Sequence, residues 1–232
     1  MHFVQCTASI VHCTTSRNKP MPPKKSEKLN RNSVIKTAIS YADKHGVDAV
    51  NVRQVARELN VGAMTLYTYI DNKADLLAGM VDMVAAEIET PAPLTPWKEA
   101  ITTIAKSTRR TIGKHPWVGP FWANAPGDAK MDHQEAILRI FRQAGFSVAD
   151  SCKGYHAVTL HAVGFALQAM HYPTQPNSLK AAAGEFLENA DHQRYPFFVE
   201  HVQYHFDFPD AGGEFEFVLD AILNSLAALL KE

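Results

Sequence analysis

The sequence predicts an all-α protein in which a small N-terminal domain of three helices precedes a larger helical body. Three observations predict this class. Helix-capping residues precede apolar stretches of helical period, Pro and Gly divide the remaining chain into segments of helical length, and no useful stretch alternates apolar and polar residues as a half-buried strand does. With 232 residues, of which 46% are hydrophobic, the chain can bury a sizeable core.

The chain divides into three parts. Residues 1–28 mix Ser, Thr, Pro and Lys without periodicity, so we expect a flexible arm there. We place a helix-turn-helix domain at residues 29–73 and a helical C-terminal domain at residues 74–232. Up to residue 73 the chain has 11 Lys and Arg against 5 Asp and Glu, whereas the rest has 12 against 19. A basic module on an acidic body suits a protein whose one end meets phosphate, although a solvated basic tail is the alternative.

The first two helices are predicted from their ends. Asn30 is placed to cap the first helix and Gly46 to end it. Asn51 caps a second, short helix, with Gln54 in the capping-box position. The first helix buries one apolar face, made of Val34, Ile35, Ala38, Ile39 and Ala42.

A tight turn at Asn60 and Val61 leads to a third helix, expected over residues 63–69. This succession is that of the DNA-binding helix-turn-helix, whose second helix enters the major groove. With Leu66 and Ile70 in the core, the other side chains form a small, hydroxylated and aromatic face: Ala63, Met64, Thr65, Tyr67, Thr68 and Tyr69. Such a face suits base edges and thymine methyl groups. The alternative is that the two tyrosines pack against the next helix.

Asn72 caps a fourth helix, which we expect to reach about Glu89 and to be the only link between the two domains. Lys73 occupies its first position, where the helix dipole disfavours a cation by up to about 1 kcal/mol. A DNA phosphate bound at the helix start would compensate this cost. A solvated lysine is the alternative.

Three stretches of the chain resemble the N-terminal domain of the TetR family of repressors, in its tetracycline-repressor-like branch: Leu29-Asn30-Arg31 through Val34-Ile35, Asn51-Val52-Arg53-Gln54-Val55-Ala56, and Leu66-Tyr67-Thr68-Tyr69-Ile70-Asp71-Asn72-Lys73-Ala74-Asp75-Leu76-Leu77. The resemblance implies a homodimer that binds double-stranded DNA at a palindromic operator. It also implies that the base and phosphate contacts fall on Arg53, Ala63, Met64, Thr65, Tyr67, Tyr69 and Lys73. Gly62 departs from the Ser or Thr that is usual near the start of the recognition helix.

The body is predicted to contain helices at residues 96–115, 117–125, 131–145, 148–172, 190–206 and 213–231, with a long loop from Pro173 to Gly184. The last helix carries an apolar stripe that is wider than one partner helix can cover, and the 148–172 helix carries small residues that permit close approach. We expect these two helices to form a four-helix dimer interface around a two-fold axis. Their burial inside a monomer is the alternative.

The aromatic segment of residues 115–122, in the body, predicts an effector site. Three bulky aromatic residues surround two prolines and a glycine, an arrangement that packs irregularly. An apolar pocket with a few polar groups is the usual form of a small-molecule site. We expect the pocket to be lined by His115, Trp117, Phe121, Trp122, Phe141, His161 and Phe165. Ordinary core packing is the alternative for each of these residues.

These features and the resemblance predict a DNA-binding transcriptional repressor that a small apolar or aromatic effector releases from its operator. The alternatives are a helical ligand carrier or enzyme, and an architectural DNA-binding protein without an effector. No nucleophile motif or phosphate-binding loop occurs, so we expect neither catalysis nor a cofactor. His201 and His205 have metal-ligand spacing, but nothing completes a site, so we expect no metal. Without an apolar stretch of about 18 residues or a secretory signal, we expect a cytoplasmic protein with no membrane span.

Overall fold

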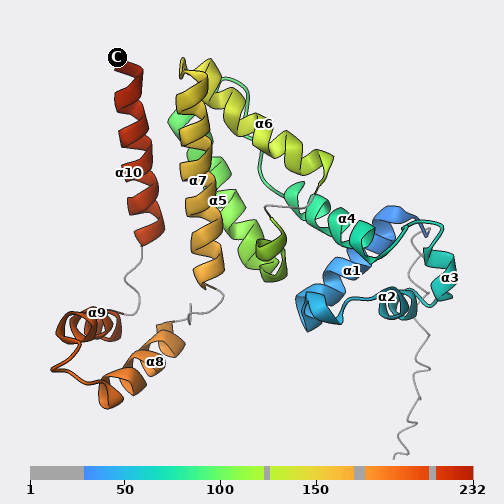
Figure 1. Ribbon diagram of the computed structural model, residues 1–232, viewed down its shortest axis with the longest axis horizontal. Coiled ribbons are helices and arrows are strands. Elements are labelled where there is room, and N and C mark those ends of the chain that lie inside the picture. The colour runs from blue at the N-terminus through green and yellow to red at the C-terminus, as the bar shows by residue number, and fades with distance from the viewer. Residues whose placement is uncertain (1–28, 123–125, 170–175, 209–212, 232) are drawn as a thin grey trace, which may run out of the picture.

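The computed structural model describes residues 29–122, 126–169, 176–208 and 213–231. Within these residues the regular elements are helices and no strand occurs, which confirms the predicted all-α class (Figure 1). The flexible arm predicted for residues 1–28 lies outside the described residues. None of the described helices is both long and apolar enough to cross a membrane.

The N-terminal domain lies at one end of the molecule (Figure 1). The predicted caps are present: the side chains of Asn30, Asn51 and Asn72 each accept a backbone N–H from three residues further on, at 2.9 to 3.1 Å. Gly46 follows the first helix with a φ of 80°, which glycine adopts without strain. The elements of this end are α1 (Arg31–His45), the 3-10 turn η1 (Val47–Ala49), α2 (Val52–Glu58), α3 (Ala63–Leu66) and α4 (Lys73–Ala85).

Two of these helices are shorter than the sequence predicts. α3 ends at Leu66, and the chain continues in turns in which the N–H of Tyr69 donates to the carbonyl of Leu66 at 2.8 Å. So short a helix is not stable alone, and the complete burial of Leu66 holds it in place. α4 ends at Ala85 instead of about Glu89, because its last turn tightens: the N–H of Glu87 donates to the carbonyl of Val84.

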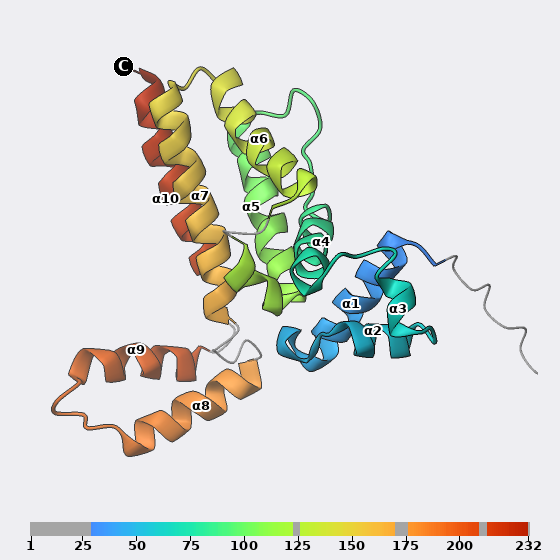
Figure 2. The ribbon, with the colours of Figure 1, turned by 45° about the vertical axis from the view of Figure 1, so that its right-hand side comes forward.

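The body is a helical bundle in which α5 packs against both α6 and α7, and α10 packs against α7. The two views show α7 and α10 side by side, on the side away from α1–α3 (Figures 1 and 2). The predicted ranges of these helices are confirmed to within about a turn. They are α5 (Trp97–Lys114), α6 (Asp128–Gln143), α7 (Val148–Ala169) and α10 (Glu214–Ala228), followed by η3 (Leu229–Lys231).

The aromatic segment predicted as a helix over 117–125 is instead the 3-10 element η2 (Pro116–Phe121), and residues 123–125 lie outside the described residues. Pro120 has no N–H to donate within a helix, so the segment cannot extend as a regular α-helix. η2 packs against α5 and α7.

The long loop expected from Pro173 to Gly184 is wrong, because α8 (Pro176–Asn189) occupies most of it. Proline at the first position of a helix is favourable, since it has no N–H to leave unpaired there. The Ala-rich stretch that follows then propagates the helix through Gly184. α9 (Pro196–Asp207) begins later than the predicted 190 and also starts at a proline. α8 and α9 pack against each other as a pair below the bundle (Figure 2).

Candidate functional site

The turn between α2 and α3 is closed by two backbone hydrogen bonds. The N–H of Val61 donates to the carbonyl of Ala56 at 3.0 Å, and the N–H of Asn60 donates to that of Arg57 at 3.1 Å. Asn60 has a φ of 55°, a left-handed conformation that Asn tolerates better than most residues. This Schellman ending determines the direction in which α3 leaves α2.

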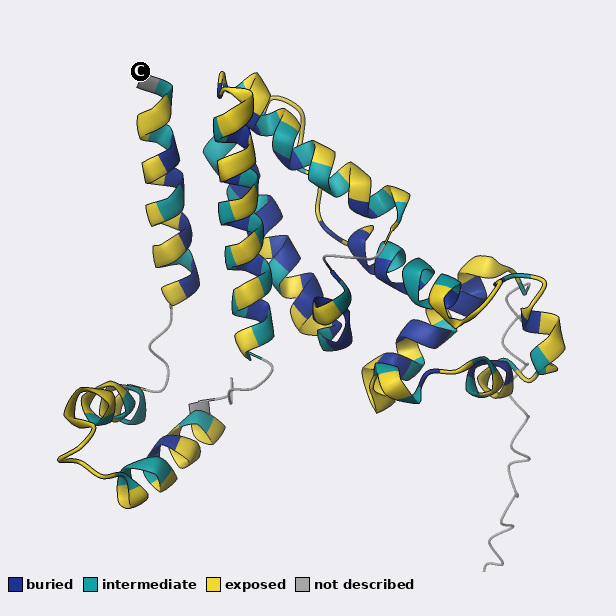
Figure 3. Ribbon diagram, viewed as in Figure 1, coloured by how far each residue is buried: buried dark blue, intermediate teal, exposed yellow. Residues whose placement is uncertain are grey.

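α3 exposes the centre of the face that the sequence predicts to contact DNA. Met64 is 79% exposed and Tyr67 is 49% exposed, whereas Leu66 between them is fully buried. Thr65 is exposed as well. The exposed side of α3 lies at the outer edge of the molecule (Figure 3). A thioether and a hydroxyl on this anchored helix, and a phenol on the residue that follows it, are thus exposed together.

The other predicted DNA contacts differ in their exposure. Arg53 on α2 and Lys73 at the start of α4 are exposed. Ala63 and Tyr69 are half-buried and pack against the hydrophobic core, so less of each side chain is available to DNA than of Met64 or Tyr67. Lys73 does not by itself require a phosphate, because the carboxylate of Asp75 supplies negative charge in the same first turn.

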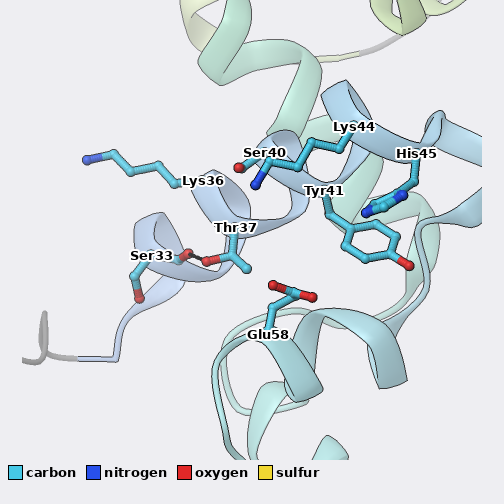
Figure 4. A pocket seen from close by; sticks show the side chains of 8 residues that line it. All are labelled: Ser33, Lys36, Thr37, Ser40, Tyr41, Lys44, His45 and Glu58. Atoms are coloured by element: carbon cyan, nitrogen blue, oxygen red, sulfur yellow. Dashed lines mark hydrogen bonds between the residues drawn. The ribbon is translucent and has the colours of Figure 1, made fainter.

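Two surface hollows flank α1. One has a volume of about 460 Å³ and lies between α1 and α2, with hydroxyl and cationic side chains around it (Figure 4). Its lining consists of Ser33, Lys36, Thr37, Ser40, Tyr41, Lys44, His45 and Glu58, none of which the sequence predicts as a site residue. The other, of about 480 Å³, lies where α1 and the end of α4 face the end of α5, and His115 lines it.

The residues predicted to line an effector pocket fall into separate groups. His115 and Trp117 face α1, where both contact Asp43. Trp122 lies edge-on to the ring of His133 on α6, at 5.8 Å between centroids. Phe121 is half-buried against the core.

The remaining predicted residues join two further aromatic groups. Phe141 packs edge-on against Phe146 at 5.3 Å and near Trp97 at 6.0 Å. The ring of His161 stacks on Phe215 at 4.6 Å, and Phe165 meets the same Phe215 edge-on at 5.3 Å.

Sequence reasoning missed several members of these groups. The guanidinium of Arg109 lies 4.5 Å from the ring centre of Phe165 and 4.7 Å from that of Phe215, so a cation covers this aromatic group. His133 lies on the buried side of α6 between Lys130 and Ile137, and the helical spacing of these positions could have revealed it. Among the described residues, no group of three or more His, Cys, Asp or Glu side chains is arranged to hold a metal.

This arrangement defines a two-part helical protein in which a helix-turn-helix domain is joined to a helical bundle. The model of the tetracyclin repressor-like C-terminal domain matches residues 90–230, and that of the bacterial regulatory proteins of the tetR family matches residues 34–80. The chain therefore belongs to the TetR family.

Its relatives are transcriptional regulators. The chain is 30% identical to the transcriptional repressor DrrR1 of Streptomyces coeruleorubidus over 161 residues, which cover 68% of this chain and 59% of that protein. It is 27% identical to the class D tetracycline repressor protein of Escherichia coli over 164 residues, or 69% of this chain and 75% of that one. The chain spans about 60% of the length of the first curated relatives that it matches.

Solved structures share the fold. The structure of ActR of Streptomyces coelicolor in complex with actinorhodin has a TM-score of 0.70 and 23% identity, and covers 89% of this chain and 100% of its own. BioQ with its double-stranded DNA operator has a TM-score of 0.59 and 22% identity, and covers 87% of this chain and 99% of its own.

Proposed function

We propose that this chain is a dimeric transcriptional repressor that binds a palindromic DNA operator through α3 and is released from it by a small apolar or aromatic effector. The observation that carries the proposal is the anchored segment of α3 and the turns after it, which exposes Met64, Thr65 and Tyr67 while Leu66 and Ile70 are buried. Exposed groups of this kind on a rigid helix suit the edges of base pairs. DNA as the partner would place the protein in the cytoplasm, as a regulator without enzymatic activity.

The DNA part of the proposal is tested by footprinting the purified protein on the DNA upstream of its own gene, followed by titration of the protected site. Met64→Ala should weaken binding by about fivefold to a hundredfold, as the loss of one base contact does. Met131→Ala is the matched control, because Met131 is equally long, 62% exposed and on α6 in the body. Equal effects of the two substitutions would remove α3 from the interface.

The effector part is supported by the aromatic groups of the body and by the ligand-bound ActR structure of the same fold. A panel of apolar and aromatic compounds should be titrated while tryptophan fluorescence and operator affinity are both recorded. We expect at least one compound to change both the tryptophan fluorescence and the operator affinity. Compounds that quench the fluorescence without ever changing operator affinity would favour an architectural DNA-binding protein.

A further inference from the structure

His115 occupies the contact between the N-terminal domain and the body. Its side chain is 3% exposed and lies between two carboxylates. The Nδ1 atom is 2.8 Å from Oδ1 of Asp43 on α1, and the Nε2 atom is 3.4 Å from Oε2 of Glu87, just after α4. One buried ring at the end of α5 therefore contacts both α1 and the segment that directly follows α4.

Trp117 reaches the same carboxylate. Its indole N–H donates to Oδ1 of Asp43 at 2.7 Å, so groups from the body converge on one oxygen of α1. Hydrogen bonds to a charged acceptor are stronger than neutral ones and depend on direction. α1 also packs against η2, and the expectation that the fourth helix is the only link between the domains is therefore wrong.

One hydrophobic core runs from the N-terminal domain into the body, and a surface hollow lies beside it at this place. The hollow of about 480 Å³ opens beside His115, and its lining includes charged side chains as well as the apolar Ile39, Met83 and Ala86. Lys114 bridges Glu87 at 2.7 Å. Directional polar contacts beside the hollow add to this packing and restrict the angle between the two parts.

We propose that Asp43, His115 and Trp117 form a junction that sets the orientation of the DNA-binding domain on the body, and thereby the half-site spacing that the dimer accepts. This inference rests on the proposed function. A dimer must place its two recognition helices about one turn of DNA apart, roughly 34 to 36 Å. A rigid junction confines the dimer to one spacing, whereas a loose junction permits several and costs more ordering free energy on binding.

The test compares operators that differ only in the distance between their half-sites. The operator found by footprinting is used alongside derivatives with one base pair inserted or removed at its centre. The proteins are the full-length wild type, Asp43→Ala and Trp117→Phe, and the last of these keeps an aromatic side chain but loses the N–H donor. Asp48→Ala is the matched control, because Asp48 is an exposed carboxylate of the same domain.

The wild type and Asp48→Ala should lose about tenfold or more in affinity when the spacing changes, a loss comparable to that caused by a mismatched base pair. In Asp43→Ala and Trp117→Phe, the loss of affinity caused by the changed spacing should be at least threefold smaller than in the wild type. Both variants should also bind the natural operator more weakly than the wild type. A general folding defect would weaken binding to every operator equally and leave the ratio unchanged. The inference would be overturned if both junction variants showed the wild-type ratio of affinities for the natural and altered operators. It would also be overturned if the affinity of the wild type did not depend on the spacing.

Amide hydrogen exchange on the DNA-free protein separates this inference from the proposed function. Residues 116–122 should exchange faster in Asp43→Ala than in the wild type or in Asp48→Ala. Unchanged exchange would overturn the junction even if the protein binds its operator. Faster exchange in a protein that binds no operator would support the contact but reject its role in spacing, together with the proposed function.

Discussion

Arg31 and Asp75 join the first turn of α1 to the first turn of α4 through two parallel hydrogen bonds. Arg31 Nη1 donates to Oδ2 at 2.8 Å and Nη2 donates to Oδ1 at 2.6 Å, while Nη1 also donates to the carbonyl of Tyr69. The hydrogen bond from Arg31 is the largest cause that lowers the pKa of Asp75 to about 2, and a backbone N–H from Asp71 adds to it. The pair holds the start of α4, which carries Lys73, close to Tyr69 in the turns that follow α3.

We predict that Asp75→Asn lowers the free energy of unfolding at neutral pH and that the deficit shrinks in acid. The pKa of Asp75 is about 2 in the folded chain and 3.8 as its ordinary value, so the contribution is present above about pH 4 and is lost as the pH falls towards 2. Because the Arg31 side chain is 45% exposed, we expect only about 1 kcal/mol or less. Urea unfolding from pH 7 to pH 3 measures it, with Asp132→Asn as the exposed control. A deficit that stays constant over this range would contradict the prediction.

His133 should make the protein less stable as the pH falls from about 6.5 to about 4. Burial lowers the pKa of His133 to about 4, below its ordinary value of 6.5, so the unfolded chain binds a proton in this range while the folded chain does not. His133→Leu should remove about 1 to 3 kcal/mol of this pH dependence. Thermal unfolding across the range checks it. If His156→Leu, at an exposed position on α7, removed as much of the pH dependence of stability, the assignment of this dependence to His133 would be refuted.

Gly127→Ala should destabilise the contact between α4 and α6. A Cβ atom at position 127 would overlap the carboxylate of Asp82, which accepts the backbone N–H of Lys130 at 3.0 Å. We expect a cost of about 1 to 3 kcal/mol in the free energy of unfolding. Gly113→Ala in α5 is the control, because its Cβ would meet open space and should stabilise the helix by about 0.5 to 1 kcal/mol. Equal stabilities of the two variants would show that Asp82 yields easily.

Lys73→Ala should reduce the salt dependence of operator binding by about one unit of slope, as expected for the loss of one phosphate contact. The fold should be unaffected, because Lys73 is exposed. Titrations at several salt concentrations give the slope, and Lys106→Ala on α5 provides a body control of the same charge. An unchanged slope would mean that Lys73 is only solvated.

Leu160→Glu should convert the proposed dimer to monomers in equilibrium sedimentation. Leu160 is 71% exposed on α7, beside α10, where Phe217 and Val218 are also exposed. An apolar surface this exposed is typical of an interface. Leu226 is a poor probe of the dimer, because it is buried within the protomer. Met131→Glu, at an exposed position on α6 outside the two predicted interface helices, is the control, and a Leu160→Glu variant that stays dimeric at micromolar concentration would place the interface elsewhere.

The sequence by itself determined the starts and the buried face of the N-terminal helices. Asn30, Asn51 and Asn72 cap helices through contacts that span three residues, so neighbouring residues contain all the information that the cap requires. The exposure of Met64 and Tyr67 follows in the same way, because a helix that buries Leu66 must turn other positions outwards. α8 was missed because its first proline also fits a loop, and only the stretch beyond it distinguishes the two.

Only the tertiary structure decided which partners the aromatic residues have. His115 and Trp117 contact Asp43, a residue more than 70 positions away, and Arg109 lies over Phe165 and Phe215 on other helices. Such pairs depend on the angles at which distant helices pack, and those angles result from many side chains fitting together at once. The spacing of residues along the sequence does not encode that fit. The aromatic segment could therefore be recognised in the sequence, whereas its neighbours in space could not.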